Sequence, residues 1–412
     1  MFLASWCESS LKDTEALPAG PLYPAAMKTP PPLPRYGEAS LADLLPSLLA
    51  ALDVPGAPNP LGLEPLRRVC LLVVDGLGWD LLLANRRAAP FLAAAAEQAV
   101  PLTTGFPATT ATSLASIGTG RPPGGHGLVG YTMALPGMER AFNCLRWSPY
   151  GLGGAKDLRD RVVPERLQPQ PTGFERAEAD GVEVTLVGAG EYATSGFTRA
   201  VLRGGNYWRT FSLGDIAAGA SRCLAEGRRS LVYAYHPDLD RTGHVRGVAS
   251  DAWRLELAHV DRLAAQLAER LPGDAALVVT GDHGMVDLRP EQRVDLADQP
   301  ELAAGVRLLA GEARARHVHT RRGATADVLD AWRALLGDDM WVVPGEEAVA
   351  AGWFGPQVPD EVRQRIGDVV AAASGPVGVV QREVDPTQAL LTGHHGSLTA
   401  AEQLVPLLLL RG

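Results

Sequence analysis

Long unbroken runs of apolar residues constrain the fold of this chain more than any other feature. Such runs occupy residues 68–75, 182–190, 229–238, 274–282 and 404–412. Continuous apolar runs of strand length are typical of strands that are buried on both faces of a parallel sheet. Segments with helical periodicity precede the first apolar run and lie between several of the later ones. We expect helices at 40–52, with Ser40 as N-cap, and at 250–271. Because strands that alternate with helices form βαβ units, we predict an α/β fold with a doubly wound, mostly parallel central sheet flanked by helices.

Two segments have a different composition from the rest of the chain. Residues 1–35 are rich in proline and small residues, which predicts a mobile tail. Residues 291–390 hold short strand candidates around one helix, TADVLDAWRALLG, with many prolines and glycines. We therefore predict a main core formed by 36–290 and 391–412, with an α+β cap inserted at 291–390.

Charge and hydropathy argue against two classes of partner. The formal net charge is −9 at pH 7, whereas a protein that binds nucleic-acid polymers needs a basic surface. No apolar stretch approaches 18 residues without a charge, so a membrane span is not expected. The first residues lack the basic region of a signal peptide, and the four cysteines form no CxxC pair. We expect a cytoplasmic protein that binds neither nucleic-acid polymer nor membrane, and the sequence identifies no protein partner.

Carboxylates and histidines follow the apolar runs at the points where strands are expected to end. Asp75 ends the first run, and Asp282 and His283 end a later one in TGDHGM. Asp240 and His244 are four residues apart, a spacing that puts both on one face of a helix. Taken singly, each has an ordinary structural explanation, such as a helix cap or a surface ion pair. Together they meet the needs of a two-metal hydrolytic site, and the mixed oxygen and nitrogen ligands favour Zn²⁺ or Mn²⁺.

Composition alone leaves the remaining histidine and the nucleophile open. His394 and His395 are equivalent candidates in TGHHGS, and His236 and Asp238 are candidates for orienting nearby ligands. A hydroxyl at the N-terminus of a helix lies beside backbone N–H groups that can receive a phosphate. The segment GFPATTATSLASIGTG offers four such hydroxyls, those of Thr109, Thr110, Thr112 and Ser113. The structural alternative is a cluster of threonines that cap the helix.

The ordered motifs VVDG, FPATT, GTGRPPGGHG, DLDRTGH, GDHGM and GHHG resemble the type I phosphodiesterases/nucleotide pyrophosphatases of the alkaline phosphatase superfamily. The resemblance spans about residues 68–412 and implies an alkaline phosphatase-like catalytic core. It implies that Thr110 is the nucleophile and that His126 is structural. It implies one metal ion held by Asp240, His244 and His395. The resemblance also implies a second metal ion, which would be held by Asp75, Asp282, His283 and the Thr110 oxygen.

Substrate-binding residues are predicted near the nucleophile segment. Family members with nucleotide pyrophosphatase activity usually carry an asparagine three residues after the nucleophile, where it donates to a phosphoryl oxygen; here Ser113 occupies that position. Tyr131, Trp147 and Tyr150 follow the segment and are candidates for stacking on a base, with core packing as the alternative.

The chain more closely resembles the actinobacterial cytoplasmic phosphodiesterases that degrade cyclic di-AMP. This resemblance rests on the segment FPATTATSLASIGTG, on the high Ala, Arg and Pro usage and on the absence of a signal peptide. It implies hydrolysis of cyclic di-AMP through linear pApA to AMP, with Mn²⁺ as the metal. The alternatives are a phosphomonoesterase or phosphonate hydrolase of the same superfamily, or a metal-dependent nucleotide-binding protein without turnover. The complete set of expected ligands argues against the last of these.

Overall fold

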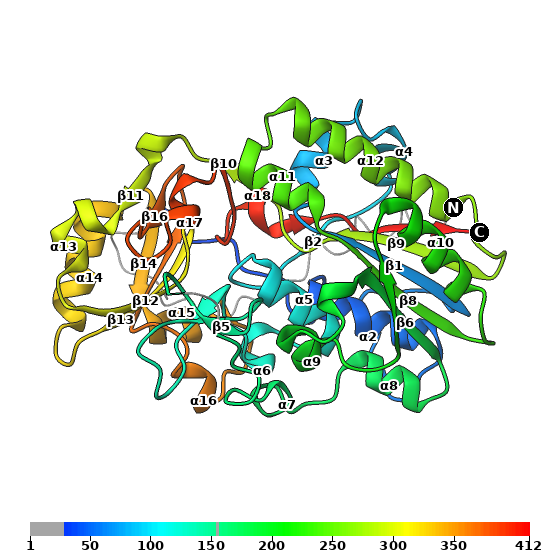
Figure 1. Ribbon diagram of the computed structural model, residues 1–412, viewed down its shortest axis with the longest axis horizontal. Helices are drawn as coiled ribbons and strands as arrows, with labels where there is room; N and C mark the ends of the chain where they lie inside the picture. Colours follow the sequence, from blue (N-terminus) through cyan, green and yellow to red (C-terminus); the bar gives the residue numbers. More distant parts are fainter. Residues whose placement is uncertain (1–28, 154–155) are drawn as a thin grey trace, which may run out of the picture.

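A six-stranded sheet forms the centre of the molecule. The computed structural model describes residues 29–153 and 156–412. The strand order is β19-β9-β1-β8-β6-β7, and all neighbours are parallel except β19, which runs antiparallel to β9 at one edge (Figure 1). The strands are β1 (Arg68–Val74), β6 (Glu183–Ala189), β7 (Asn206–Thr210), β8 (Ser230–His236), β9 (Ala275–Gly281) and β19 (Leu408–Arg411). The predicted mostly parallel sheet is therefore confirmed.

Helices cover both faces of this sheet. Alternate residues of β1 point to opposite faces: Val69, Leu71 and Val73 join one buried cluster, and the residues between them join the other. The first cluster packs against α2 (Leu41–Ala51), α5 (Thr110–Thr119), α8 (Gly173–Ala179) and α9 (Gly196–Val201). The second packs against α3 (Trp79–Ala84), α4 (Pro90–Ala96), α10 (Leu213–Leu224) and α12 (Asp251–Ala268) (Figure 1). In the described ranges, no helix is both long and apolar enough to cross a bilayer.

The predicted helix starts agree with the structure. Ser40 is the N-cap of α2, and its backbone N–H donates to Asp43 at 2.9 Å in a capping box. Ser250 is the N-cap of α12, where its hydroxyl accepts from the N–H of Trp253 at 3.1 Å. The final apolar run differs from its prediction, because Pro406 lacks an N–H and separates β18 (Leu404–Val405) from β19.

A second, four-stranded antiparallel sheet lies beside the core, at the end drawn in yellow and orange (Figure 1). Its order is β12-β13-β15-β14, with α14 (Thr325–Leu336) on one face. The strands are β12 (Val306–Glu312), β13 (Ala315–Thr320), β14 (Met340–Pro344) and β15 (Val369–Ala373). Its other face, which includes Trp341 and Val370, belongs to the large buried cluster that also contains residues of α2 and α5. We propose that residues 291–390 form the inserted cap.

Smaller elements surround these two sheets. Short strand pairs join β2 (Leu102–Thr103) to β18, β10 (Val286–Asp287) to β17 (Gly393–His394), and β11 (Arg293–Asp295) to β16 (Gly378–Val380). A three-stranded sheet contains β3 (Thr132–Met133), β4 (Phe142–Asn143) and β5 (Ser148–Pro149). The remaining short helices are α6 (Pro123–His126), α7 (Pro164–Leu167), α11 (Asp238–Arg246), α13 (Pro300–Ala303), α15 (Gly345–Ala350), α16 (Asp360–Arg363), α17 (Pro386–Leu390) and α18 (Ala400–Gln403).

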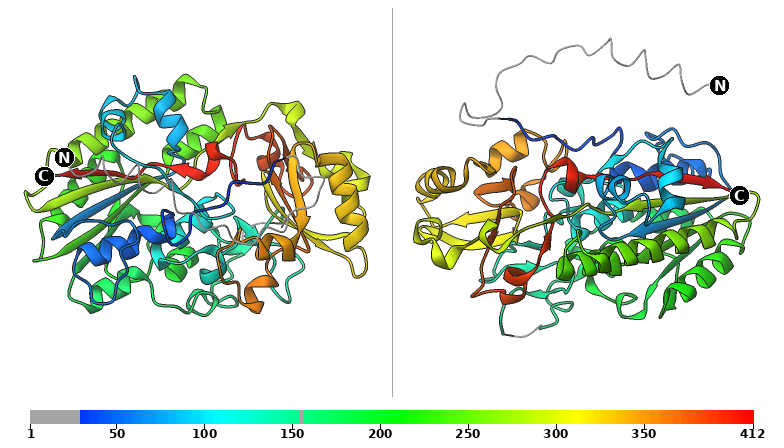
Figure 2. Two further views of the ribbon diagram at one scale, coloured as in Figure 1. Left: turned by 180° about the vertical axis from the view of Figure 1, so that it is seen from behind. Right: turned by 90° about the horizontal axis from the view of Figure 1, so that it is seen from above.

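The N-terminal segment differs in part from its prediction as a mobile tail. Residues 1–28 of that prediction lie outside the described residues. The next residues run along the body as extended chain, seen at the near side of the rear view (Figure 2). Trp341 Nε1 donates to the Thr29 carbonyl at 2.7 Å, and Gln403 Nε2 donates to the Pro32 carbonyl at 2.8 Å. The described part of this segment is therefore attached to both the cap and the core.

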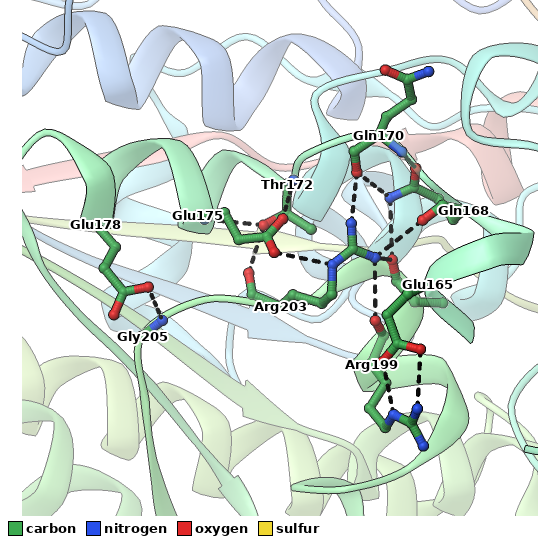
Figure 3. Close-up of polar contacts among 10 residues, drawn as sticks. Glu165, Gln168, Gln170, Thr172, Glu175, Glu178, Arg199, Arg203 and Gly205 are labelled. Carbon is green, nitrogen blue, oxygen red and sulfur yellow. Dashed lines mark hydrogen bonds and ion pairs between the residues drawn. The ribbon is translucent and has the colours of Figure 1, made fainter. Parts of the chain in front are cut away.

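A charged network links α9 and the residues after it to α7 and α8 (Figure 3). Arg199 makes a bidentate ion pair with Glu165 of α7 at 2.9 and 3.0 Å. Arg203 pairs with Glu175 of α8 at 3.1 Å and donates to several carbonyls around Gln168. Exposed ion pairs stabilise a fold only slightly, so we expect this network to contribute little to the stability of the fold.

Candidate metal-binding active site

The carboxyl ends of three neighbouring parallel strands bring the predicted carboxylates together. Asp75 follows β1, Asp282 follows β9, and Asp240 lies in α11 directly after β8. The order β9-β1-β8 places these three chain ends side by side at one edge of the sheet. Ligand sites of open α/β sheets lie at this edge. The sheet topology therefore accounts for the meeting of residues that are far apart in the sequence.

One group of predicted ligands surrounds the Thr110 hydroxyl. Thr110 Oγ1 lies 3.2 Å from His283 Nε2 and 3.5 Å from Asp75 Oδ1. His283 Nε2 is 3.3 Å from Asp75 Oδ1 and 3.8 Å from Asp282 Oδ1. Asp75, Asp282 and His283 are all buried and present ligand atoms that lie within 4.8 Å of one another. The residues predicted for one metal ion are thus adjacent to the predicted nucleophile.

The other predicted group lies next to the first. Asp240 Oδ2 is 3.4 Å from His244 Nε2, and Asp240 Oδ1 is 3.9 Å from His395 Nε2. The ring of His395 stacks on that of His283 with centroids 3.6 Å apart. Ligand atoms of Asp240, His283 and His395 lie within 4.8 Å of one another, so His283 belongs to both clusters, whereas His244 stands slightly apart.

Each of the three histidines is oriented by a backbone carbonyl. The Nδ1 atoms of His244, His283 and His395 lie 2.7, 2.9 and 2.9 Å from the carbonyls of Gly393, Gly284 and Ala108. An Nδ1–H that donates to a carbonyl leaves Nε2 free to bind a metal, and metal-binding histidines are commonly held in this way. In all three rings Nε2 is the atom that faces the carboxylates.

The electrostatics of the cluster suit divalent cations. Burial and the nearby charge of Asp75 raise the pKa values of Asp240 and Asp282 well above the ordinary value. Burial also raises the pKa of Asp75, but its hydrogen bond with His283 and the charge of that ring outweigh this and lower it. Asp240 Oδ1 and Asp282 Oδ2 are buried without a hydrogen-bond partner among the described residues. A cation would both bind these oxygens and offset the repulsion, so the residues fit metal ions.

The N-terminus of α5 separates the four candidate hydroxyls. Thr110 is the first helical residue and contacts Asp75 and His283. Thr109 is the N-cap, and its hydroxyl donates to Glu312 Oε2 at 3.0 Å. Thr112 and Ser113 are fully buried and line no part of the cavity described below. Among these four, Thr110 is the hydroxyl that faces the ligand cluster.

A cavity of about 770 Å³ opens over this cluster, and its walls include Asp75, Thr110 and Asp240. Two aromatic pairs from separate parts of the chain line it. Tyr131 and Tyr150 meet edge to face with centroids 5.9 Å apart, and Tyr192 and Tyr235 do so at 6.1 Å. Apolar and aromatic walls around a few polar groups are typical of small-molecule sites.

Two predicted substrate-binding residues do not reach this cavity, which corrects the sequence-based expectation. Trp147 is buried, packs edge to face on Phe142 and donates from Nε1 to the Val162 carbonyl at 2.6 Å. Its backbone has a positive φ of 53°, which turns the ring toward Gly196, where a Cβ would lie 2.2 Å from the ring. Ser113 lies on a buried side of α5, and its hydroxyl has no partner among the described residues. Tyr131 lines the cavity.

The other candidate histidines have structural partners. His236 Nε2 lies 3.1 Å from Glu256 and points away from the cluster, although His236, Asp238 and Glu256 form a separate group of donor atoms. His394 Nε2 lies 3.0 Å from the Leu391 carbonyl, so His395 is the histidine in the site. His126 is buried, and its ring bonds to Ser116 and to the backbone N–H of Leu128.

Two residues in the site were missed by the sequence analysis. The Tyr235 hydroxyl donates to Asp75 Oδ2, and alternation along β8 could have indicated that it and Tyr233 share the face that borders the cavity. Glu312 comes from the cap and touches Thr109 and His395. Burial raises the pKa of Glu312 to about 8. Nothing in the local sequence around Glu312 indicates that it enters the site.

Comparisons with known proteins agree with this geometry. The profile of the family described as Type I phosphodiesterase / nucleotide pyrophosphatase matches residues 69–398. Murine ectonucleotide pyrophosphatase/phosphodiesterase 5 is 19% identical over 82% of this chain and 87% of its own, with a TM-score of 0.61. An inactive threonine-to-alanine variant of that murine protein, in complex with AMP, is 18% identical over 83% and 87%, with a TM-score of 0.59. Phosphonoacetate hydrolase from Sinorhizobium meliloti, in complex with phosphonoformate, is 18% identical over 84% and 91%, with a TM-score of 0.62. No significant match is found among curated protein sequences.

Proposed function

Because the chain belongs to the type I phosphodiesterase/nucleotide pyrophosphatase family, we propose that it cleaves nucleotide phosphodiester bonds through a covalent intermediate on Thr110. The predicted alkaline phosphatase-like α/β fold and the class of enzyme, a phosphodiester hydrolase, follow from the family and from the solved structures of similar fold. The observation that carries the mechanism is the position of Thr110 Oγ1, 3.2 Å from His283 and 3.5 Å from Asp75 at the N-terminus of a buried helix.

The family is one of divalent-metal-dependent enzymes, and two ions, Mn²⁺ or Zn²⁺, are proposed here. Asp75, Asp282, His283 and the Thr110 oxygen would hold one, and Asp240, His244 and His395 would hold the other. Carboxylates mixed with imidazoles suit both metals. When bound, such cations lower the pKa of the nucleophile and neutralise charge on the phosphoryl group.

The proposed reaction has two displacements at phosphorus. Thr110 Oγ attacks the phosphorus, the P–O bond to the leaving group breaks, and the proton lost by Thr110 passes through solvent to the departing oxygen, which leaves as an alcohol. The backbone N–H groups at the start of α5 stand beside the oxygens of the transferred group. Water then attacks the phosphothreonine, the P–O bond to Thr110 breaks, and the proton lost by the water returns to the Thr110 oxygen. His283, whose ring is held by the Gly284 carbonyl, lies beside Thr110 as a proposed ligand of the ion that Thr110 would share.

Cyclic di-AMP is the proposed substrate, cleaved to pApA and then to AMP. The cavity of about 770 Å³ lies in the upper part of the range for small-molecule pockets, which is roughly 300–1,000 Å³. Its two aromatic pairs, Tyr131 with Tyr150 and Tyr192 with Tyr235, offer a surface for each of two bases. The murine relative in complex with AMP is consistent with an adenine nucleotide as ligand.

A phosphonate hydrolase is the second candidate. The similarity in fold to phosphonoacetate hydrolase favours it, and Ser113, which stands where nucleotide pyrophosphatases carry asparagine, does not oppose it. The size and aromatic walls of the cavity favour the larger substrate.

Chromatography of reaction products separates these candidates. The enzyme, loaded with Mn²⁺ or Zn²⁺, is incubated with cyclic di-AMP, pApA, cyclic di-GMP, ATP and phosphonoacetate, with Thr110→Ala as the matched control. We expect cyclic di-AMP to give pApA and AMP and Thr110→Ala to give neither. Preferred cleavage of phosphonoacetate would replace the proposed substrate, and diester cleavage by Thr110→Ala would remove the proposed nucleophile.

A further inference from the structure

The N-cap of the nucleophile helix does not cap its own helix. Thr109 has extended backbone angles (φ −145°, ψ 150°), as an N-cap residue should, but its side chain accepts no hydrogen bond from α5. At several other helix starts the N-cap hydroxyl does accept one, as Thr172 does from Glu175, Ser195 from Thr198 and Ser250 from Trp253, whereas Ser40 and Thr399 accept none. The side chain of Thr109 is therefore held in another direction.

Glu312 holds it there. Thr109 Oγ1 donates to Glu312 Oε2 at 3.0 Å, and both residues are buried and line the cavity. Glu312 is the last residue of β12 and follows Gly311, which has a positive φ of 81°. Its Oε1 atom is buried and has no hydrogen-bond partner among the described residues. A residue of the cap thus reaches the helix that carries the nucleophile.

The absence of a side chain at Gly396 leaves room for the Glu312 side chain. Gly396 adopts a φ of 128°, and a Cβ there would lie 2.8 Å from Glu312 Cγ. Glu312 Oε2 is also 3.5 Å from Nδ1 of His395, the neighbour of this glycine. Substitution of Gly396 would therefore displace Glu312, so the two segments fit each other closely.

The direction of the Thr109 hydroxyl decides what the start of α5 can bind. Ser113 N–H is the first to bond within the helix, to the Thr109 carbonyl at 2.9 Å. Among the described residues, the N–H groups of Thr110, Ala111 and Thr112 have no acceptor. An N-cap hydroxyl in its usual rotamer would accept from one of them and would compete with an anion.

We propose that Glu312 is a positioning residue for phosphoryl transfer: it binds the Thr109 hydroxyl and thereby leaves the N–H groups of α5 free for a phosphoryl oxygen. The proposal rests on the proposed function of Thr110 and extends it to a residue of the cap. It assigns to Glu312 an effect through Thr109, without contact with the reacting atoms.

Two substitutions isolate the hydrogen bond. Glu312→Leu and Glu312→Gln both remove the carboxylate, but only the leucine removes the acceptor oxygen. Each is made in the native background and together with Thr109→Val, a side chain of similar shape that cannot cap a helix. The readouts are the dissociation constant of inorganic phosphate on the metal-loaded protein, kcat and KM for a diester, and bound metal.

In the native background, Glu312→Leu should weaken phosphate binding and lower kcat/KM by roughly 2- to 30-fold relative to Glu312→Gln, the range set by an N-cap hydrogen bond. In the Thr109→Val background the two Glu312 variants should have equal phosphate affinity and equal kcat/KM. The amount of bound metal should be the same in all variants. An equal loss in both backgrounds, or no loss in either, would overturn the proposal. Phosphate binding is measured without turnover, so failure of the substrate assignment would leave this test intact.

Discussion

The hydroxyl of Tyr235 offers a sharp test of the proposed metal centre. It donates to Asp75 Oδ2, while Asp75 Oδ1 faces Thr110 and His283. Burial and the Asp75 charge raise the pKa of Tyr235 well above its ordinary value, so the hydroxyl keeps its proton and remains a donor. Tyr235→Phe removes this one hydrogen bond and leaves the ring, which packs edge to face on Tyr192, in place.

The size of the effect follows from the charge on the acceptor. A hydrogen bond to an ionised group contributes about 1.5–3 kcal/mol, and loss of a partner that orients a metal ligand weakens metal binding by roughly 10- to 100-fold. We therefore expect Tyr235→Phe to weaken the site that Asp75 completes by that factor. At saturating metal, kcat should recover most of its value, because the nucleophile and all ligands remain.

Tyr233→Phe is the matched control. Tyr233 lies two residues earlier on β8, also borders the cavity, and its buried hydroxyl has no partner among the described residues. Titration of the metal against a chelator of known affinity, followed for both variants, gives the two dissociation constants. Equal affinities for the two variants would refute the account of Asp75 as a ligand held by Tyr235.

Three further predictions concern other parts of the chain. Asp282→Asn should abolish turnover and reduce bound metal while the circular dichroism spectrum stays native; native rates would contradict its assignment as a ligand. Arg314 forms a buried bidentate pair with Glu402 at 3.0 and 2.6 Å, so Arg314→Met should lower the free energy of unfolding in urea by about 3–5 kcal/mol, because Glu402 is left buried and unpaired. Burial lowers the pKa of His126 to about 3, so the folded state resists protonation that the unfolded chain accepts below about pH 6.5. The stability that neutral His126 contributes is complete above that pH and is lost as the pH falls toward 3, by about 1.4 kcal/mol per pH unit. His126→Asn should therefore reduce the slope of unfolding free energy against pH between about pH 7 and pH 5. An unchanged slope would contradict the assignment of His126 as a buried neutral group.

The central sheet could be predicted because its strands are buried on both faces. Runs such as 68–75 and 274–282 leave no polar face, and a strand of this kind requires helices on both sides. The edge strand β7 was not predicted, since its residues NYWRT are partly exposed and show no such run. The split of the last run at Pro406 follows from a missing N–H that hydropathy does not register.

The candidate site could be predicted only in part. Its metal ligands follow strands, so their positions in the sequence carry a signal that the resemblance then makes specific. Glu312 carries no such signal, because its contact with Thr109 depends on how the cap packs against the core. Trp147 looked like a base-stacking residue because it follows the nucleophile segment, but its positive φ turns it into the core.

The stereochemical course at phosphorus tests the central claim most directly. A phosphorothioate diester of known configuration is hydrolysed in ¹⁸O-labelled water by the metal-loaded enzyme, and the configuration of the product is determined. Two displacements, the first by Thr110 Oγ and the second by water, each invert the phosphorus, so the account predicts overall retention. Net inversion would mean that water attacks directly, and Thr110 would then not be the nucleophile.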